Sequence, residues 1–209
     1  MTFNDAAFTV ILPHKRNPGN DAALQICLSC LMDNTDSDYY LMSSVADNQP
    51  LYGTINRMIE LAPTDCCVYV NSDMFMAPGW DAPMLELYDE RTFVTNVLVE
   101  PGAIAMHPMN LHKDFGRTPE TFRRAEFEDY VKTAPILEGE GWYCPVMFSS
   151  LGWQYMGGHD VSQGEFHDNV PADIRLFEKW KLAGNQVKRA PSFTYHLQRY
   201  SDPKEQAKR

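Results

Sequence analysis

The first hundred residues of the chain alternate between short apolar runs and longer segments with helical periodicity. The apolar runs have the length and composition of β-strands and lie at 8–12, 39–45, 66–70 and 92–99. The segments between them place apolar residues on one helical face and lie at about 21–33, 51–62 and 81–89. Because strands that alternate with helices pair in parallel, this order predicts an α/β fold with a mostly parallel sheet.

The second half of the chain is less regular. A helix is predicted over about 118–133, because Pro119 stands at the first helical position, where proline is tolerated. Another helix is predicted over 172–183 and ends at Gly184. A closing strand at 187–196 follows it, with Pro191 as an interruption.

The size and composition of the chain limit its class. A chain of 209 residues with 44 % hydrophobic residues fits one domain with a real core. We predict a single domain over 1–209, with a first half at 8–100, a second half at about 101–200 and a tail at 201–209. The net charge of −10 argues against a protein that binds the nucleic-acid backbone through an overall positive charge. Without a signal-peptide pattern or an apolar run of ~20 residues, a cytoplasmic protein with no stable membrane insertion is expected.

Cysteine usage points to a reducing compartment. The chain has five cysteines, and Cys27 and Cys30 form a CxxC pair inside a periodic helical segment. A redox pair would sit at a helix start, where the helix dipole lowers the thiol pKa. We therefore predict buried structural thiols at these positions and reduced cysteines throughout.

The strand predicted at 66–70 runs directly into Asn71-Ser72-Asp73. Side chains at i and i+2 of an extended segment point the same way, so Asn71 and Asp73 can share one target. The carboxyl edge of such a sheet is where ligands bind. Hard oxygen ligands at this spacing suit Mg²⁺ or Mn²⁺ carrying a diphosphate. The alternative is that Ser72 and Asp73 only cap the following turn.

A second group of polar residues lies in the second half, among aromatic and glycine residues. Asp173 opens a predicted helix and can act as a base or simply as a cap. His196 stands alone at the end of an apolar strand, where a histidine is usually satisfied by its surroundings. Trp153 is a packing residue or a platform under an acceptor. His159 lies in what we expect to be a solvated loop. The sequence contains no Gly-rich phosphate loop and no GxSxG elbow.

The order of these pieces resembles the GT-A fold glycosyltransferases, in particular glycosyltransferase family 2. The resemblance covers the chain from Phe8 to about His196 and rests on the number, order and spacing of short motifs. The matching segments are Ile11-Leu12-Pro13, Ala46-Asp47-Asn48, Tyr52 to Asn56, Asn71-Ser72-Asp73, Pro78-Gly79-Trp80, Gly157-Gly158, Ala172-Asp173 to Ala183-Gly184, and His196.

This resemblance implies a GT-A-like (Rossmann-like) sheet flanked by helices, with a smaller acceptor-side region. It implies transfer of a sugar, with inversion, from a nucleotide diphosphate sugar such as a UDP-sugar to an acceptor hydroxyl, assisted by Mn²⁺ or Mg²⁺. Asp173 would be the catalytic base, and Asp73 and His196 would bind the metal. Trp153 and Gly158 would lie on the acceptor side. The residues implied for nucleotide-sugar binding are Pro13, Asp47, Asn48, Asn56, Asn71, Ser72 and Asp73.

Two positions depart from the family pattern, and they keep other functions open. The first Asp of the DxD-type motif is Asn71, which brings no charge to a metal, and the Glu before the catalytic Asp is Ala172. These changes motivate a non-catalytic nucleotide-sugar- or carbohydrate-binding protein as an alternative. A sugar nucleotidyltransferase is a further alternative, but the segment Pro13 to Gly19 only faintly echoes the basic Gly-rich loop it needs.

The acceptor stays open at the level of sequence. A small molecule, a glycan, a protein and modified DNA are all candidates. A hydroxymethylated DNA base in a phage-infected host cytoplasm is one of them, which the acidic balance of the chain neither demands nor supports.

Overall fold

The computed structural model describes residues 6–45, 51–102, 109–141, 143–162, 166–167 and 170–197. Its helices are α1 (Pro18–Asn34), α2 (Leu51–Glu60), α3 (Asp81–Leu87), the 3₁₀ turn η1 (Pro119–Thr121), α4 (Arg124–Tyr130), α5 (Ser150–Tyr155) and α6 (Ala172–Leu182). Its strands are β1 (Phe8–His14), β2 (Tyr39–Val45), β3 (Cys66–Tyr69), β4 (Met74–Met76), β5 (Thr92–Glu100), β6 (Leu111–His112), β7 (Val146–Ser149), β8 (Phe166–His167), β9 (Val170–Pro171) and β10 (Gln186–His196).

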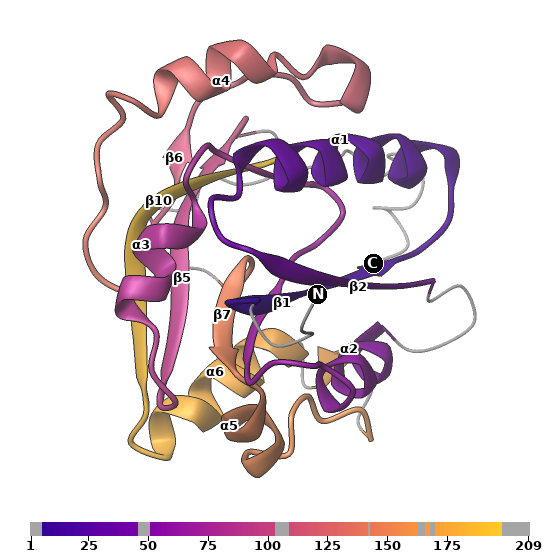
Figure 1. Ribbon diagram of the computed structural model, residues 1–209, viewed down its shortest axis with the longest axis vertical. Coiled ribbons are helices and arrows are strands. Elements are labelled where there is room, and N and C mark those ends of the chain that lie inside the picture. The colour runs from indigo at the N-terminus through magenta and orange to yellow at the C-terminus, as the bar shows by residue number, and fades with distance from the viewer. Residues whose placement is uncertain are drawn as a thin grey trace.

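One central sheet joins strands from both halves of the chain. Its order is β2-β1-β3-β7-β5-β10-β4, with β6 beside β5 (Figure 1). The pairs β1–β2, β1–β3, β5–β6 and β5–β10 are parallel. The strands β4 and β7 enter antiparallel to their neighbours, so the sheet is mixed. Every described position of β1, β3 and β5 is buried, as expected for strands covered on both faces.

The helices of the first half cover opposite faces of β1 and β2, with α1 on one face and α2 on the other (Figure 1). The helix α1 begins three residues before the start predicted from the sequence, at about residue 21. The cap is Asn17, whose side chain accepts a hydrogen bond from the Asn20 N–H, and Pro18 occupies the first turn. Both cysteines of the CxxC pair are buried in α1, and burial raises the pKa of Cys30 to about 12. The prediction of structural thiols is confirmed.

The helix predicted over 118–133 is wrong in its extent. The structure has the single turn η1 and then the short helix α4. Phe122 between them is extended, and the Arg123 N–H turns away to the Phe115 carbonyl at 2.7 Å. This break lets the Arg124 guanidinium reach Asp33 at 2.7 Å and Asn34 at 3.2 Å on α1. The contact fastens α4 over the carboxyl end of α1.

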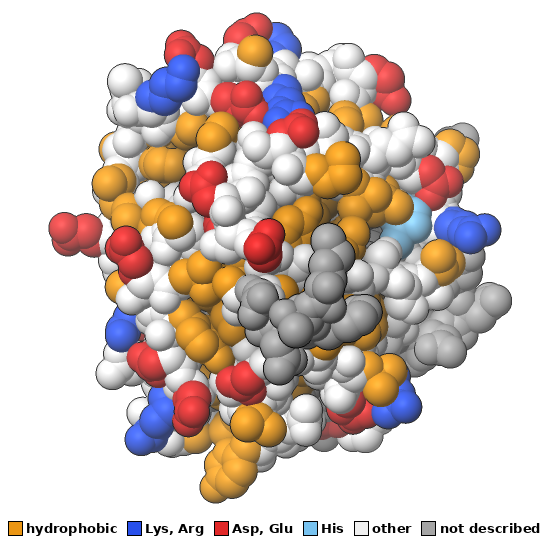
Figure 2. Space-filling model, viewed as in Figure 1, with side chains coloured by type: hydrophobic (Ala, Val, Ile, Leu, Met, Phe, Trp, Pro, Cys, Tyr) orange, Lys and Arg blue, Asp and Glu red, His pale blue; other side chains and the backbone are white. Residues whose placement is uncertain are grey.

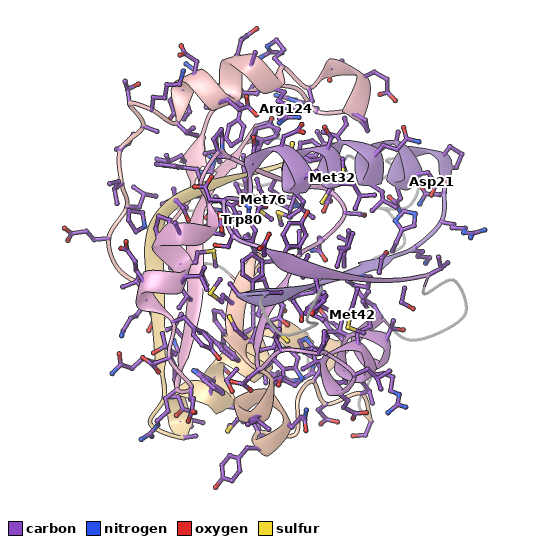
Figure 3. The ribbon with its side chains drawn as sticks, viewed as in Figure 1. Asp21, Met32, Met42, Met76, Trp80 and Arg124 are labelled. Carbon is purple, nitrogen blue, oxygen red and sulfur yellow. The ribbon has the colours of Figure 1, made fainter. Side chains whose placement is uncertain are left out.

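Buried aromatic side chains pack in two groups, one around Trp80 and one around Trp180. Trp80 packs edge-on against Phe8, and its indole N–H donates to the hydroxyl of Thr35, the residue after α1, at 2.9 Å. In Figure 3, Trp80 is labelled beside Met76 below α1, and Arg124 is labelled above this helix. In the second group, Trp180 of α6 stacks on Phe93 of β5 with ring centroids 4.0 Å apart.

Within the described residues, no helix has both the length and the apolar character needed to cross a bilayer. On the face drawn in Figure 2, basic and acidic side chains are interspersed.

Candidate active site

The register of three strands brings Asp73, His196 and Glu100 together. Antiparallel pairing of β4 with β10 sets His196 opposite Met74, next to Asp73. Parallel pairing of β5 with β10 aligns Tyr195 with Val99, which places Glu100 beside His196. The Leu197 N–H also donates to the Asp73 carbonyl at 3.1 Å, which fixes the turn before β4 against the end of β10. Three residues far apart in sequence thus meet at one sheet edge.

The imidazole of His196 lies between two carboxylates. Its Nδ1 is 2.7 Å from Glu100 Oε1, and its Nε2 is 3.7 Å from Asp73 Oδ2. Burial alone would lower the pKa of His196, but hydrogen bonds and charges from Asp73 and Glu100 raise it to about 9. Glu100 is itself buried, and its other oxygen accepts a hydrogen bond from the Asn110 amide at 2.7 Å. Asn110 and Glu100 therefore hold the orientation of the His196 ring.

A small pocket opens beside this cluster. It has a volume of about 150 Å³. Its wall includes Tyr52, Tyr69, Asn71, Tyr143, Asp173 and His196. The Tyr69 hydroxyl donates a short hydrogen bond to the Asn71 amide oxygen, so the side chain of Asn71 is held from the strand that precedes it. The pocket therefore unites three residues that the sequence singled out: Asn71, Asp173 and His196.

Asp173 has two environments at once. Its carboxylate accepts the N–H of the next residue, Ile174, at 2.9 Å in the first turn of α6, where an acidic residue also suits the helix dipole. The same side chain also lines the pocket shared with Asn71 and His196. Burial raises the pKa of Asp173, while the Ile174 N–H partly offsets this rise. A carboxylate with a raised pKa in the wall of a pocket can accept a proton from a bound hydroxyl group.

The residues Asn56, Trp153 and Gly158 form a separate packed group. The Asn56 amide oxygen accepts the Trp153 indole N–H at 3.1 Å and the His159 N–H at 3.0 Å, and its NH₂ donates to the His159 carbonyl at 2.9 Å. Trp153 is buried in the core. The structure therefore does not bring these three residues to the pocket that contains Asp173. All three instead line a different hollow, which shares no residue with that pocket.

The prediction of a solvated loop is wrong for His159. The side chain is 2 % exposed, and its Nε2 is 2.6 Å from the Tyr143 hydroxyl. Burial lowers the pKa of His159 to about 3, so the imidazole is neutral. Its Nε2 contact holds the Tyr143 hydroxyl in place.

Gly158 is required by close packing, and this gives a stability prediction. Its φ is +59°, and a Cβ there would lie 2.5 Å from Asn56 Oδ1. The neighbouring Gly157 has φ +76°, but a Cβ there would lie 3.5 Å from the nearest atom, the flexible Lys179 Nζ. The strain of a positive φ is common to both variants, so overpacking against Asn56 should make Gly158→Ala lower the free energy of unfolding by about 1–3 kcal/mol more than the matched control Gly157→Ala. Urea denaturation of both variants measures the difference, and equal losses would contradict this packing role.

The other predicted donor-side residues are placed as follows. Pro13 is buried near the end of β1, opposite Ser44 of β2. Ser72 lies in the turn closed by the Met74 N–H on the Asn71 carbonyl at 3.1 Å. Asp47 and Asn48 lie outside the described residues.

Sequence reasoning missed Glu100 and Tyr143. Glu100 follows a long apolar strand and precedes Pro101-Gly102, so it has the same signal, a strand that ends on an acidic residue, as Asp73. Only the register with β10 shows that it meets His196. Tyr143 had no local signal, because an aromatic residue in an aromatic-rich segment is usually a core residue.

The chain has no matching family model and no matching curated protein. Among solved structures, it is similar to "Crystal structure of GalNAc-T7 with UDP, GalNAc and Mn2+", with a TM-score of 0.58 and 9 % identity. The fold is GT-A-like. The match covers 92 % of this chain and 43 % of that chain, so this chain spans less than half the length of that protein. At this identity the likeness concerns the fold, and the expected GT-A-like architecture is confirmed, with a mixed sheet.

Proposed function

We propose that this protein is a glycosyltransferase, related to family 2, that transfers a sugar with inversion from a UDP-sugar to an acceptor hydroxyl. The observation that carries the proposal is that Asp173 and His196 line one pocket in a GT-A-like fold, while the Asp73 carboxylate lies 3.7 Å from the His196 ring. The similar protein, GalNAc-T7, was crystallised with UDP, GalNAc and Mn²⁺.

The side chains of Asp73 and His196 supply part of the ligand set that a divalent cation needs. Asp73 Oδ2 and His196 Nε2 are 3.7 Å apart, a spacing at which one ion can contact both once the ion displaces the Nε2 proton that the raised pKa of His196 favours. Within the described residues, no group of three or more His, Cys, Asp or Glu side chains is arranged to hold a metal. Oxygens of the donor diphosphate would complete the ligand set. When bound, Mn²⁺ or Mg²⁺ would stabilise negative charge on the leaving diphosphate as a Lewis acid.

The chain's own residues supply the rest of the chemistry. Asp173 takes the proton of the acceptor hydroxyl as its oxygen bonds to the anomeric carbon and the bond to the diphosphate breaks. Tyr143 and Tyr69 form an apolar wall whose burial limits water near that carbon, with ring centroids 5.5 Å apart. A single displacement of this kind inverts the anomeric centre and needs no covalent nucleophile.

A panel of nucleotide sugars, with and without Mn²⁺, tests the proposal. UDP or a UDP-sugar should raise Tm by about 5–10 °C at 100 times its Kd, and only with the metal present. Slow release of UDP from a UDP-sugar should accompany binding, because water can replace the acceptor. Binding without any turnover would favour the non-catalytic alternative that Asn71 and Ala172 motivate. Neither binding nor turnover with any nucleotide sugar would contradict the proposal.

Glu100 gives a prediction about metal affinity. Its carboxylate holds His196 by Nδ1, as outer carboxylates hold metal-binding histidines. Glu100→Gln should weaken Mn²⁺ binding in the presence of UDP by about 10- to 100-fold. Electron paramagnetic resonance of free Mn²⁺ measures the affinity directly. Glu86→Gln, on the exposed side of α3, is the control for net charge. Equal Mn²⁺ affinity in the two variants would exclude this positioning role.

A further inference from the structure

A second pocket lies on the other side of Asp173. It has a volume of about 240 Å³ and includes both Asp173 and Tyr143 in its wall, as the first pocket does. The two hollows therefore meet at the carboxylate that would accept the proton. Because the first pocket also contains Asn71 and His196, the second is the one left for the acceptor.

The walls of the second pocket are mainly apolar. Met109, Ile174 and Phe177 line it together with Tyr143, and the rings of Tyr143 and Phe177 meet edge to face with centroids 5.3 Å apart. An apolar cavity of about 150 Å³ can hold benzene. A pocket of this size therefore accommodates one ring or a short alkyl group within its walls.

The charged groups of this pocket are mostly acidic. Glu140, Glu178 and Asp173 lie in the wall. Lys181, which also lines the pocket, is paired with Glu140 at 2.8 Å. A phosphate or a nucleic-acid backbone brought here would face two carboxylates beyond the paired one, which is unfavourable at short range.

We propose that this second pocket binds the uncharged apolar group of an acceptor, such as the aryl or alkyl group of a glycoside, and so selects acceptors whose hydroxyl lies beside it. The assignment of the occupant as an acceptor rests on the proposed transfer. The physical claim, an apolar and cation-tolerant subsite next to Asp173, stands on the pocket itself.

Methionine methyl groups allow the two pockets to be observed separately. Met109 lines the second pocket, Met74 lines the first, and Met32 is 72 % exposed on α1. In methyl-labelled protein, phenyl β-D-glucoside should shift the Met109 signal in a saturable way and leave Met32 unchanged. Methyl β-D-glucoside should bind about tenfold more weakly or worse, because it buries no ring. UDP with Mg²⁺ should shift Met74.

Three substitutions on α6 complete the test. Ile174→Asp should abolish the effect of phenyl β-D-glucoside, whereas Leu182→Asp, at an 89 % exposed position of the same helix, should not. Glu178→Lys, an exposed change that should not impair folding, should improve binding of glucose 6-phosphate without loss of the phenyl glucoside.

The outcomes separate this inference from the proposed function. Equal affinity for the phenyl and methyl glucosides, or tighter binding of glucose 6-phosphate or a DNA oligonucleotide by the unmodified protein, would overturn the apolar subsite. A Met109 shift with phenyl glucoside but no Met74 shift with UDP and Mg²⁺ would support the subsite and count against the proposed function. A Met74 shift without a Met109 shift would do the reverse.

Discussion

Replacing Asp173 by Asn should lower kcat by about 100- to 10,000-fold, the contribution typical of a general base. Asn keeps an oxygen that can accept the Ile174 N–H, so the contact in the first turn of α6 is preserved. UDP affinity in the presence of Mn²⁺ should be unchanged, because Asp73 and His196 are intact. The control Asp129→Asn, on the exposed side of α4, should keep wild-type kcat.

The pH dependence gives the same test a second readout. The active form of Asp173 is the carboxylate, so the rate falls as pH drops through its pKa. Because burial raises that pKa in the folded protein, the fall should begin at a higher pH than for an exposed aspartate. The residual activity of Asp173→Asn should lack this acid limb. Wild-type kcat in Asp173→Asn would leave Asp173 with only a structural role in the first turn of α6.

Replacing Asp73 by Asn should remove most metal-dependent UDP binding. Asp73 is the charged oxygen donor next to His196 Nε2, and Asn71 supplies no charge to compensate. The loss should exceed the roughly 100-fold upper range for outer partners of a metal ligand. Isothermal titration of UDP with and without Mn²⁺ measures it, with Asp38→Asn at an exposed position as the control. An Asp73→Asn variant that binds UDP with Mn²⁺ as the wild type does would show that the metal is held elsewhere.

Much of the first half could be predicted from the sequence because its signals are local. The strand at Tyr39–Val45 has the predicted limits, and the helix at Leu51–Glu60 is within two residues of the prediction. Apolar periodicity determines such elements without knowledge of their partners. The three-residue strand Met74–Met76 was missed because it exists only through pairing with β10, more than a hundred residues later.

The candidate site shows the same contrast between local sequence signals and long-range pairing. Asn71, Asp173 and His196 were found by motif and order, and the structure brings them to one pocket. Asn56 and Trp153 were also taken from the motif order, but the Trp153 indole N–H bonds the Asn56 amide oxygen in a packed group apart from that pocket. A motif records residue type and spacing, whereas the long-range register of strands and loops decides which side chains face one another.

The most direct measurement of the central claim is the position of Mn²⁺ in a crystal grown with UDP. Anomalous scattering at the manganese edge locates the ion without reference to the surrounding residues. The account predicts one strong peak within coordination distance of Asp73 and His196, with the UDP diphosphate on it and Asp173 across the pocket. A manganese peak away from Asp73 and His196, or UDP bound at another face of the sheet, would contradict the account.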